Sequence, residues 1–370
     1  MNPLCDFVVL TFNKIDVTKN FVKSLLVNTS LPIRVIFVDN ASHDGTRDYL
    51  RSLKESENCH FEIILNENNL GFIKGVNQGL AKAQAPFICI ANNDLTFTPG
   101  WLEEIIALFH KRPEVGLLNP NSNNLGVAPS AQQPLEDFAF VLKKYSGEFI
   151  ELTDCIGFCM VLKTEVLEKV GFLSEEFLPM FFEDTDYSRR VSQAGWRVGM
   201  ARASYVWHQE HSSILQLGDE RQKIFDKSKE AFLKKWGRTL RLGWVVDGQD
   251  LDGVLAKAIT IARLGNYVWL LVKNLKRDRR KIFSENNSDE LADIKFVPYQ
   301  NEVQLLWNVL IKKKKYDYVI VQGKPLPRLL QFFGQKTLDP SELNRISALK
   351  KLPAYKINPT VDESSEVKEK

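Results

Sequence analysis

The stretch Phe87–Asp94, which reads FICIANND, decides the fold of this chain. Its first five residues are uncharged and mostly apolar, which predicts a buried strand. The three polar residues that follow stand at the carboxyl end of that strand, where open α/β sheets place their ligands. Asp94 would be a hard oxygen ligand at this position, which suits Mg²⁺ or Mn²⁺. The alternative is a simple turn, because Asn and Asp favour turns.

Strand-like and helix-like segments alternate on the N-terminal side of this stretch. Apolar runs predict strands at residues 6–11, 33–38 and 61–65, and helical patterns occur at residues 16–27 and around Leu50. This β-α-β-α-β-α-β order predicts a parallel sheet with helices on both faces and right-handed crossovers. Three glycines in residues 70–80 weaken a helix there by roughly 1 kcal/mol each. They suit a place where the backbone approaches a ligand or another element closely.

The segments after residue 100 predict a larger and a smaller α/β domain. The larger one continues with helices at 100–110, 164–170, 184–194 and 219–236, strands at 115–118, 156–162, 197–200 and 205–208, and a long loop at 119–134. The smaller one has strands at 242–246, 267–272, 294–297 and 318–321, with helices at 250–264 and 302–313. We therefore divide the chain into residues 1–240, 241–337 and a polar tail, 338–370, that we expect to be partly disordered.

The composition indicates the cellular compartment and excludes some classes of binding partner. The net charge is only +3, so no global basic field indicates nucleic acid. The five cysteines are an odd number without a CxxC pair, which favours reduced thiols in a cytoplasmic protein. The basic run Lys312–Lys315 is better explained as a solvated helix end than as a membrane contact. The apolar segment Ala258–Val272 is short and interrupted, so we expect at most peripheral membrane contact.

Seven short motifs occur in a fixed order over some 200 residues. They are VVLTFN (8–13), VDNAS with DGT (38–46), NLGF with NQG (69–79), NND (92–94), GFCM (157–160), FEDTD with Arg190 (182–190), and His208 with Ser212 or Ser213. Each is weak alone, but together they form a specific signal. By these motifs, residues 6–236 resemble the inverting glycosyltransferases of family 2, which have the GT-A fold, and are close to its rhamnosyltransferase-like members. The resemblance does not extend beyond about residue 240.

The resemblance implies a UDP- or dTDP-sugar as donor. It places Asp39 at the N3–H of a uracil or thymine ring, with Thr11 and Asn13 lining the same pocket. A capping or turn aspartate is the alternative for Asp39. Lys74 is a candidate phosphate contact, although simple surface exposure explains it equally well. The full expected nucleotide set is Thr11, Asn13, Asp39, Lys74, Asn77 and Asn93.

A divalent cation, Mn²⁺ or Mg²⁺, is the expected cofactor, because a departing diphosphate needs its charge stabilised. The family usually supplies an Asp-x-Asp triplet, and here Asn92 replaces the first aspartate. Asp94 is then the one carboxylate of the triplet. His208 matches the late metal histidine of the family, and His211 is the competing candidate.

The acidic cluster Glu183-Asp184-Thr185-Asp186 is the expected catalytic centre. Inverting transfer needs a carboxylate near the acceptor hydroxyl to take its proton, and Asp184 holds the base position of the family. Charge at a helix N-terminus would explain one acid but explains three in four residues less readily. Gly157, Glu183 and Trp207 are weaker candidates for contacts with the donor or acceptor sugar.

These observations predict an inverting glycosyltransferase that moves a sugar from a UDP- or dTDP-sugar to a glycan, lipid-linked or protein acceptor. A homodimer is possible, and the role of residues 241–370 is open. A non-catalytic sugar-nucleotide or glycan-binding module is the main alternative, because fold does not determine function. A nucleotidyltransferase is less favoured, since Thr11–Lys14 lacks the glycines of a phosphate loop.

Overall fold

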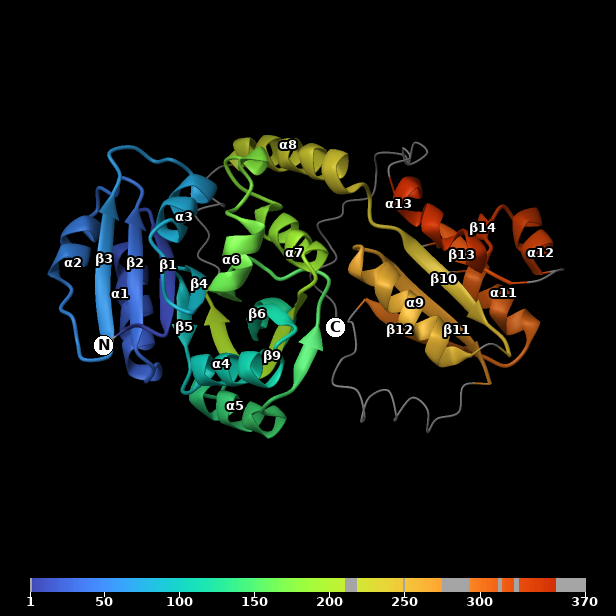
Figure 1. The fold of residues 1–370 in the computed structure, drawn as a ribbon, viewed down its shortest axis with the longest axis horizontal. Helices are drawn as coiled ribbons and strands as arrows, with labels where there is room; N and C mark the ends of the chain where they lie inside the picture. The colour runs from blue at the N-terminus through green and yellow to red at the C-terminus, as the bar shows by residue number, and fades with distance from the viewer. Residues whose placement is uncertain are drawn as a thin grey trace.

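The computed structural model describes residues 2–209, 218–248, 250–274, 293–311, 315–322 and 326–350. Two sheets divide the chain (Figure 1). The first sheet has the strand order β3-β2-β1-β4-β8-β6-β9-β5, with β7 paired to β9. The second has the order β12-β11-β10-β13-β14. Residues 211–213 and 312–314, which include His211 and most of the basic run, lie outside the described residues.

The first half of the first sheet is parallel, as the alternating pattern predicts. Its strands are β1 (Cys5–Thr11), β2 (Ile33–Asp39), β3 (Cys59–Leu65) and β4 (Phe87–Asn92). The helices between them are α1 (Ile15–Asn28), α2 (Thr46–Ser52) and α3 (Phe72–Leu80). Thr11 pairs with Asp39, and Leu10 with Asn92. The carboxyl ends of these strands therefore meet at one edge.

The second half of the sheet is mixed. Its strands are β5 (Leu95–Phe97), β6 (Val115–Asn121), β7 (Phe149–Glu151), β8 (Cys159–Lys163) and β9 (Arg197–His208). Its helices are α4 (Trp101–Lys111), α5 (Leu135–Leu142), α6 (Thr164–Val170), α7 (Glu183–Gln193) and α8 (Gly218–Trp236), with short 3₁₀ turns η1 (Asn123–Leu125), η2 (Lys143–Tyr145) and η3 (Glu175–Phe177). β8 runs antiparallel to β4 and β6, whereas β6 and β9 are parallel.

Several boundaries differ from the sequence-based expectation. The strand expected at 156–162 is β8, which begins only at Cys159, and the helix expected at 302–313 is α11, which ends at Leu310. Residues 197–200 and 205–208, expected as two strands, form the single strand β9, which absorbs a register shift opposite Pro120 and Asn121. The expected loop at 119–134 begins later, because β6 continues through Asn121 and η1 follows.

Both faces of the first sheet are buried. Phe7 and Val9 of β1 pack with α1 and α4 on one face, while Val8 packs with α3 and α7 on the other. The glycines of α3 are explained by this packing. A Cβ on Gly75 would lie 2.3 Å from Leu10 Cδ1, and one on Gly79 would lie 2.4 Å from Val8 Cγ1. They let the helix approach the sheet, rather than a ligand.

The second domain is a parallel sheet with helices on both faces. Its strands are β10 (Arg241–Val246), β11 (Tyr267–Lys273), β12 (Ile294–Tyr299), β13 (Tyr318–Ile320) and β14 (Thr337–Leu338). The helices α9 (Leu251–Arg263) and α13 (Ile346–Leu349) pack on one face, after the turn η5 (Pro340–Arg345). The helices α11 (Glu302–Leu310) and α12 (Leu326–Phe332) pack on the other.

The expectation of a polar tail from residue 338 is wrong for residues 338–350. Leu338, Ile346 and Leu349 are buried in the core of the second domain, on the α9 face of its sheet. These few apolar residues are spaced too irregularly to predict a helix, and β13 and α9 supply their packing partners.

The remaining global features are simple. All five cysteines are buried and free. No helix among the described residues is both long enough and apolar enough to cross a bilayer.

Candidate functional site

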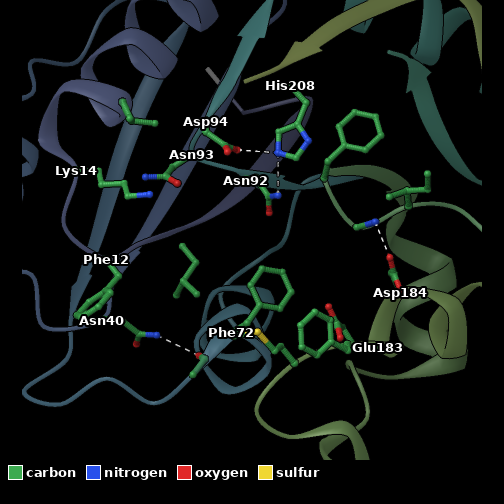
Figure 2. A pocket seen from close by; sticks show the side chains of 18 of the residues that line it. Phe12, Lys14, Asn40, Phe72, Asn92, Asn93, Asp94, Glu183, Asp184 and His208 are labelled. Carbon is green, nitrogen blue, oxygen red and sulfur yellow. Dashed lines mark hydrogen bonds and ion pairs between the residues drawn. The ribbon is translucent and has the colours of Figure 1, made fainter. Parts of the chain in front are cut away.

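A cavity of about 390 Å³ opens where the carboxyl ends of β1 and β4 meet the start of α7. Its walls come from the loop after β1, the turn before α3, the Asn92–Asp94 triplet, η1, residues 156–158 and residues 180–184. Figure 2 shows Asp94 and His208 together on one side of this pocket, with Glu183 and Asp184 on another.

The structure brings half of the expected site residues to this cavity. Those that line it are Asn93, Asp94, Gly157, Glu183, Asp184 and His208. Those that do not are Thr11, Asn13, Asp39, Lys74, Asn77 and Trp207. The first group comes from four segments far apart in sequence, namely the carboxyl end of β4, the loop before β8, the start of α7 and the end of β9.

Asp94 and His208 form the metal-binding candidate. The two side chains are largely buried, and Asp94 Oδ1 lies 3.0 Å from His208 Nε2. The imidazole also stacks on the ring of Phe158, with centroids 5.6 Å apart. Within the described parts of the chain, no three His, Cys, Asp or Glu side chains are grouped to hold a metal by themselves. One carboxylate and one imidazole fit a divalent cation that takes its other ligands from diphosphate and water.

The loop at η1 orients the imidazole. Asn123 binds both backbone groups of His208, and the amide nitrogen of Asn124 lies 2.6 Å from His208 Nδ1. The Asn124 Oδ1 atom is buried without a hydrogen-bond partner. Rotating that amide by 180° would let Nδ1–H donate to Oδ1 and leave the Nε2 lone pair facing Asp94. This is the tautomer that a metal-ligating histidine requires.

Asp184 is held in one orientation at the opposite wall. Its Oδ2 accepts the N–H of Gly157 at 2.8 Å, and its Oδ1 accepts the N–H of Thr185 at 2.7 Å. Burial raises the pKa of Asp184 above its ordinary value, although these hydrogen bonds oppose the shift. A Cβ on Gly157 would come within 3.2 Å of the same carboxylate, so a glycine suits this close contact.

The three acids of the cluster have different surroundings. Burial, with a smaller contribution from the neighbouring Asp184, raises the pKa of Glu183 to about 8. Glu183 lines the cavity, and its Oε2 is buried without a partner. Asp186 points into the protein instead, where Arg190 Nε at 2.7 Å and Lys235 Nζ at 2.8 Å neutralise it. Glu183 and Asp184 are therefore the pair with access to a ligand.

Strained backbone surrounds the cavity. Phe181 and Phe182, directly before α7, have φ of 75° and 67°, and Lys14 after β1 has φ of 61°. Residues other than glycine adopt this left-handed conformation at a cost of order 1–3 kcal/mol. All three line the cavity. Backbone strain of this kind is common at functional sites, and the sequence patterns did not predict it.

The residues that were expected to bind the nucleotide base instead form hydrogen bonds within a loop. Asp39 is fully buried and accepts hydrogen bonds from Thr11 Oγ1 at 3.1 Å and Ser42 N at 3.0 Å, with Arg47 Nε at 3.4 Å. Asn13 donates its N–H to Ser42 and accepts that of His43. These contacts shape residues 40–46 rather than the cavity surface.

The other expected residues also contact protein or solvent. The Asn77 side chain binds both backbone groups of Leu173 and ties α3 to the loop after α6. Lys74 is exposed, and Trp207 packs beside α5. In their place the structure brings Phe12, Asn40 and further side chains to the cavity, namely Asn69, Asn124, Phe158 and Met180. Phe12, Asn40 and Asn69 lie inside motifs already noted, whereas Asn124 had no sequence signal.

The segment 151–157 connects this site with the second domain. Glu151 binds Arg263 of α9, with Nε–Oε1 at 2.5 Å, and Thr153 binds Asp293 before β12. Asp154 pairs with Arg189 of α7 at 3.3 Å. Three residues later, Gly157 contacts Asp184. We call residues 151–157 the strap.

Comparison with known proteins assigns the class. Residues 6–171 match the family model described as glycosyl transferase family 2. The N-acetylglucosaminyl-diphospho-decaprenol L-rhamnosyltransferase of Mycobacterium tuberculosis is 24% identical over 246 residues, covering 58% of this chain and 78% of that protein. The low-salt glycan biosynthesis hexosyltransferase Agl10 of Haloferax volcanii is 20% identical over 266 residues, covering 69% and 80%.

Among solved structures, the mannosyltransferase PcManGT from Pyrobaculum calidifontis, in complex with GDP-Man and Mn²⁺, superposes with a TM-score of 0.46 at 15% identity. The match covers 71% of this chain and 81% of that one. The protein is an enzyme of the glycosyltransferase class. Over residues 6–171, its first domain is similar to the family 2 glycosyltransferases, in agreement with the motifs.

Proposed function

We propose that the first domain transfers a sugar from a nucleoside-diphosphate sugar to an acceptor hydroxyl, with inversion at the anomeric carbon. One observation carries this proposal. A single cavity has a paired carboxylate and imidazole, Asp94 and His208, on one wall and an oriented carboxylate, Asp184, on another (Figure 2).

Asp184 is proposed as the general base. Its carboxylate takes the proton of the acceptor hydroxyl while that oxygen bonds to the anomeric carbon. The bond from this carbon to the diphosphate breaks on the opposite face, which inverts the configuration. The Gly157 N–H holds one carboxylate oxygen at 2.8 Å and so keeps the base in a single orientation.

Asp94 and His208 are the residues that would hold Mn²⁺ or Mg²⁺. A cation bound there supplies charge stabilisation for the departing diphosphate. With two protein donors, the metal depends on diphosphate oxygens for a large share of its ligands. We therefore expect its affinity to rise when nucleotide is bound.

UDP or dTDP is proposed as the nucleotide on the strength of the family resemblance. Phe12, half exposed at the cavity, offers an aromatic face to a base. Direct contact between the base and Asp39 would require Ser42 and Arg47 to move, because they already contact its carboxylate.

A glycan or lipid-linked acceptor is proposed from the relatives. The mycobacterial protein is named as acting on a sugar linked through diphosphate to decaprenol, and Agl10 is named for glycan biosynthesis. Neither name determines which sugar this chain transfers.

The test is calorimetric titration with UDP and dTDP, with and without Mn²⁺, on wild type and Asp94→Ala. We expect metal-dependent binding that is lost in Asp94→Ala and kept in Asp48→Ala, an exposed aspartate of α2. Tight binding that ignores both metal and Asp94 would overturn the metal assignment. No binding of either nucleotide under any condition would favour a non-catalytic glycan-binding module instead.

A further inference from the structure

Two successive residues with left-handed backbone stand directly before the acids of the cavity. Phe181 and Phe182 have φ of 75° and 67°, and Glu183 and Asp184 begin α7 right after them. Phe182 is the N-cap residue of α7, and its side chain caps no backbone N–H of the helix. Residues other than glycine are strained in this conformation, and such strain persists only where surrounding contacts hold it. The contacts that hold this turn therefore also hold the acids.

The helix α8 supplies a hydrogen bond to the segment that enters this turn. Ser228 of α8 is buried, and its Oγ donates to the carbonyl oxygen of Met180 at 2.8 Å. The same hydroxyl lies 3.5 Å from the carbonyl oxygen of Phe177. A buried carbonyl group that loses its donor costs free energy, so this bond favours the observed path of the chain. Because Met180 directly precedes the two left-handed residues, Ser228 fixes the start of the turn.

Aromatic rings of α8 pack against the strained residues themselves. The ring centroid of Phe225 lies 5.6 Å from that of Phe181 and 5.3 Å from that of Phe182. The ring of Phe232, one helical stretch further along α8, lies 5.0 Å from that of Phe182. Aromatic pairs at these separations attract each other beyond simple burial. Both left-handed residues are therefore held by a ring of the same helix.

The end of α8 also binds the first turn of α7. Asp186 accepts a hydrogen bond from Trp236 Nε1 at 2.9 Å and pairs with Lys235 Nζ at 2.8 Å. The helix α8 thus contacts the chain before, within and after the strained turn. It is the last helix before β10, so it also joins the first domain to the second (Figure 1).

We propose that Phe225 and Ser228 of α8 are positioning residues for the Asp184 carboxylate. They hold a strained turn that relaxes when they are removed, and Asp184 moves with the start of α7. Neither residue is among those that line the cavity, so they act through Met180, Phe181 and Phe182, which do. A misplacement of a catalytic group by about 1 Å can lower a rate about 100-fold. This inference rests on the proposed role of Asp184 as the general base.

The first test compares Phe225→Ala and Ser228→Ala with wild type in the full chain. Release of UDP from UDP-glucose, UDP-galactose and UDP-GlcNAc, and of dTDP from dTDP-rhamnose, is measured with Mn²⁺ and with water as the acceptor. We expect each variant to lower kcat at least about tenfold. The KM for donor should stay within about twofold of wild type, because Asp94 and His208 lie on another side of the cavity (Figure 2).

Two further variants show whether the effect is specific. Phe225→Leu keeps a large apolar side chain against the turn and should recover most of the kcat lost in Phe225→Ala. The matched control is Leu233→Ala, at a position of the same helix that is 41% exposed, and it should have wild-type kcat. Circular dichroism confirms that each variant is folded at the temperature of the measurement.

A second readout needs no turnover. The N–H of Gly157 donates to Asp184 Oδ2, so its hydrogen exchange reports whether the carboxylate is in place. We expect exchange at Gly157 to be at least about tenfold faster in Phe225→Ala and Ser228→Ala than in wild type, and unchanged in Leu233→Ala.

The outcomes separate this inference from the proposed sugar transfer. Wild-type kcat together with wild-type exchange at Gly157 in both alanine variants would overturn the positioning role. Exchange that is faster throughout the first domain would also overturn it, because α8 would then only stabilise the fold. A wild type without turnover, combined with faster exchange at Gly157 alone in the variants, would count against sugar transfer and support the hold of α8 on Asp184.

Discussion

Asp184 and Asp186 lie two residues apart on α7, yet their environments separate their roles. Asp184 faces the cavity and is oriented by Gly157. Asp186 is fully buried, and Trp236 Nε1 donates to it at 2.9 Å alongside its two ion pairs. Helical geometry turns neighbouring positions in different directions, so acids close in sequence acquire separate functions.

We expect Asp184→Asn to lower kcat by about 10²–10⁴-fold, the usual contribution of a general base. Asparagine can still accept the Gly157 N–H, so UDP affinity should stay within about twofold of wild type. The contrasting variant is Asp186→Asn, which should lower the free energy of unfolding and leave kcat largely intact in the folded protein. Kinetics and calorimetry on both variants check this, and normal turnover by Asp184→Asn would refute the base assignment.

The buried Glu183 makes stability depend on pH. Its folded pKa of about 8 is above its ordinary value of 4.5, so the folded state keeps a proton that the unfolded chain releases. The free energy of unfolding should therefore fall as pH rises from about 4.5 to about 8.

Replacing Glu183 with glutamine removes this titration. We expect Glu183→Gln to raise the melting temperature at pH 8 relative to wild type, with much less effect near pH 5, because pH 5 is only slightly above the ordinary pKa of 4.5 and the unfolded chain gains little there from releasing the proton. The exposed Glu165→Gln on α6 is the control. Thermal unfolding at both pH values measures the difference, and an equal shift at pH 5 and pH 8 would contradict the role of the Glu183 proton.

At the scale of elements, α3 and β1 are matched through small residues. Gly79 sits over Val8, and Gly75 sits over Leu10, with no room for a Cβ between helix and strand. Leu10 also lines the cavity, so the approach of α3 helps to shape it.

We expect Gly79→Ala to destabilise the protein by about 1–3 kcal/mol through overpacking, despite the better helix propensity of alanine. Val8→Ala removes Val8 Cγ1, the atom that a Cβ on Gly79 would meet. By itself, this substitution lowers the free energy of unfolding because it leaves a cavity. The double variant should be less destabilised than the sum of the two single variants. Chemical unfolding of all three tests this, and simple additivity would show that the clash is relieved elsewhere.

At the scale of the whole molecule, the strap links the second domain to the site. The Glu151 carboxylate is buried and shared between Arg263 of α9 and Arg197 of β9. Further along, Cys155 N donates to Ser188 Oγ at 2.9 Å, and this hydroxyl donates to Asp184 O at 2.9 Å. The second domain is therefore positioned to influence Asp184.

We expect Arg263→Ala to reduce stability by about 1–2 kcal/mol, because Glu151 keeps only one of its two cationic partners. It should also lower kcat a few-fold with little change in the KM for donor, since the strap positions the base and not the nucleotide. Arg345→Ala is the control, because Arg345 pairs locally with Glu342 in the same domain. If both variants have wild-type kcat, the contact between Arg263 and the strap does not influence catalysis.

The sequence by itself determined the parallel half-sheet and the residues at its polar edge. Periods of two and 3.6 residues and the order of strands are local properties, and they predicted β1 to β4 and α1 correctly. The carboxyl ends of parallel strands must share an edge, so Asn93 and Asp94 reach the cavity as expected. The order of the motifs also indicated the resemblance to family 2 glycosyltransferases, and through it the candidate site residues His208 and Asp184.

Only the tertiary structure decided which side chains face a ligand. Asp39 ends its strand in a motif typical of nucleotide binding, yet Thr11 and Arg47 surround its carboxylate. Asn124 reaches His208 across 84 positions, and Arg263 reaches Glu151 across 112. No local pattern encodes such pairs, because burial and hydrogen bonding depend on which distant elements pack together.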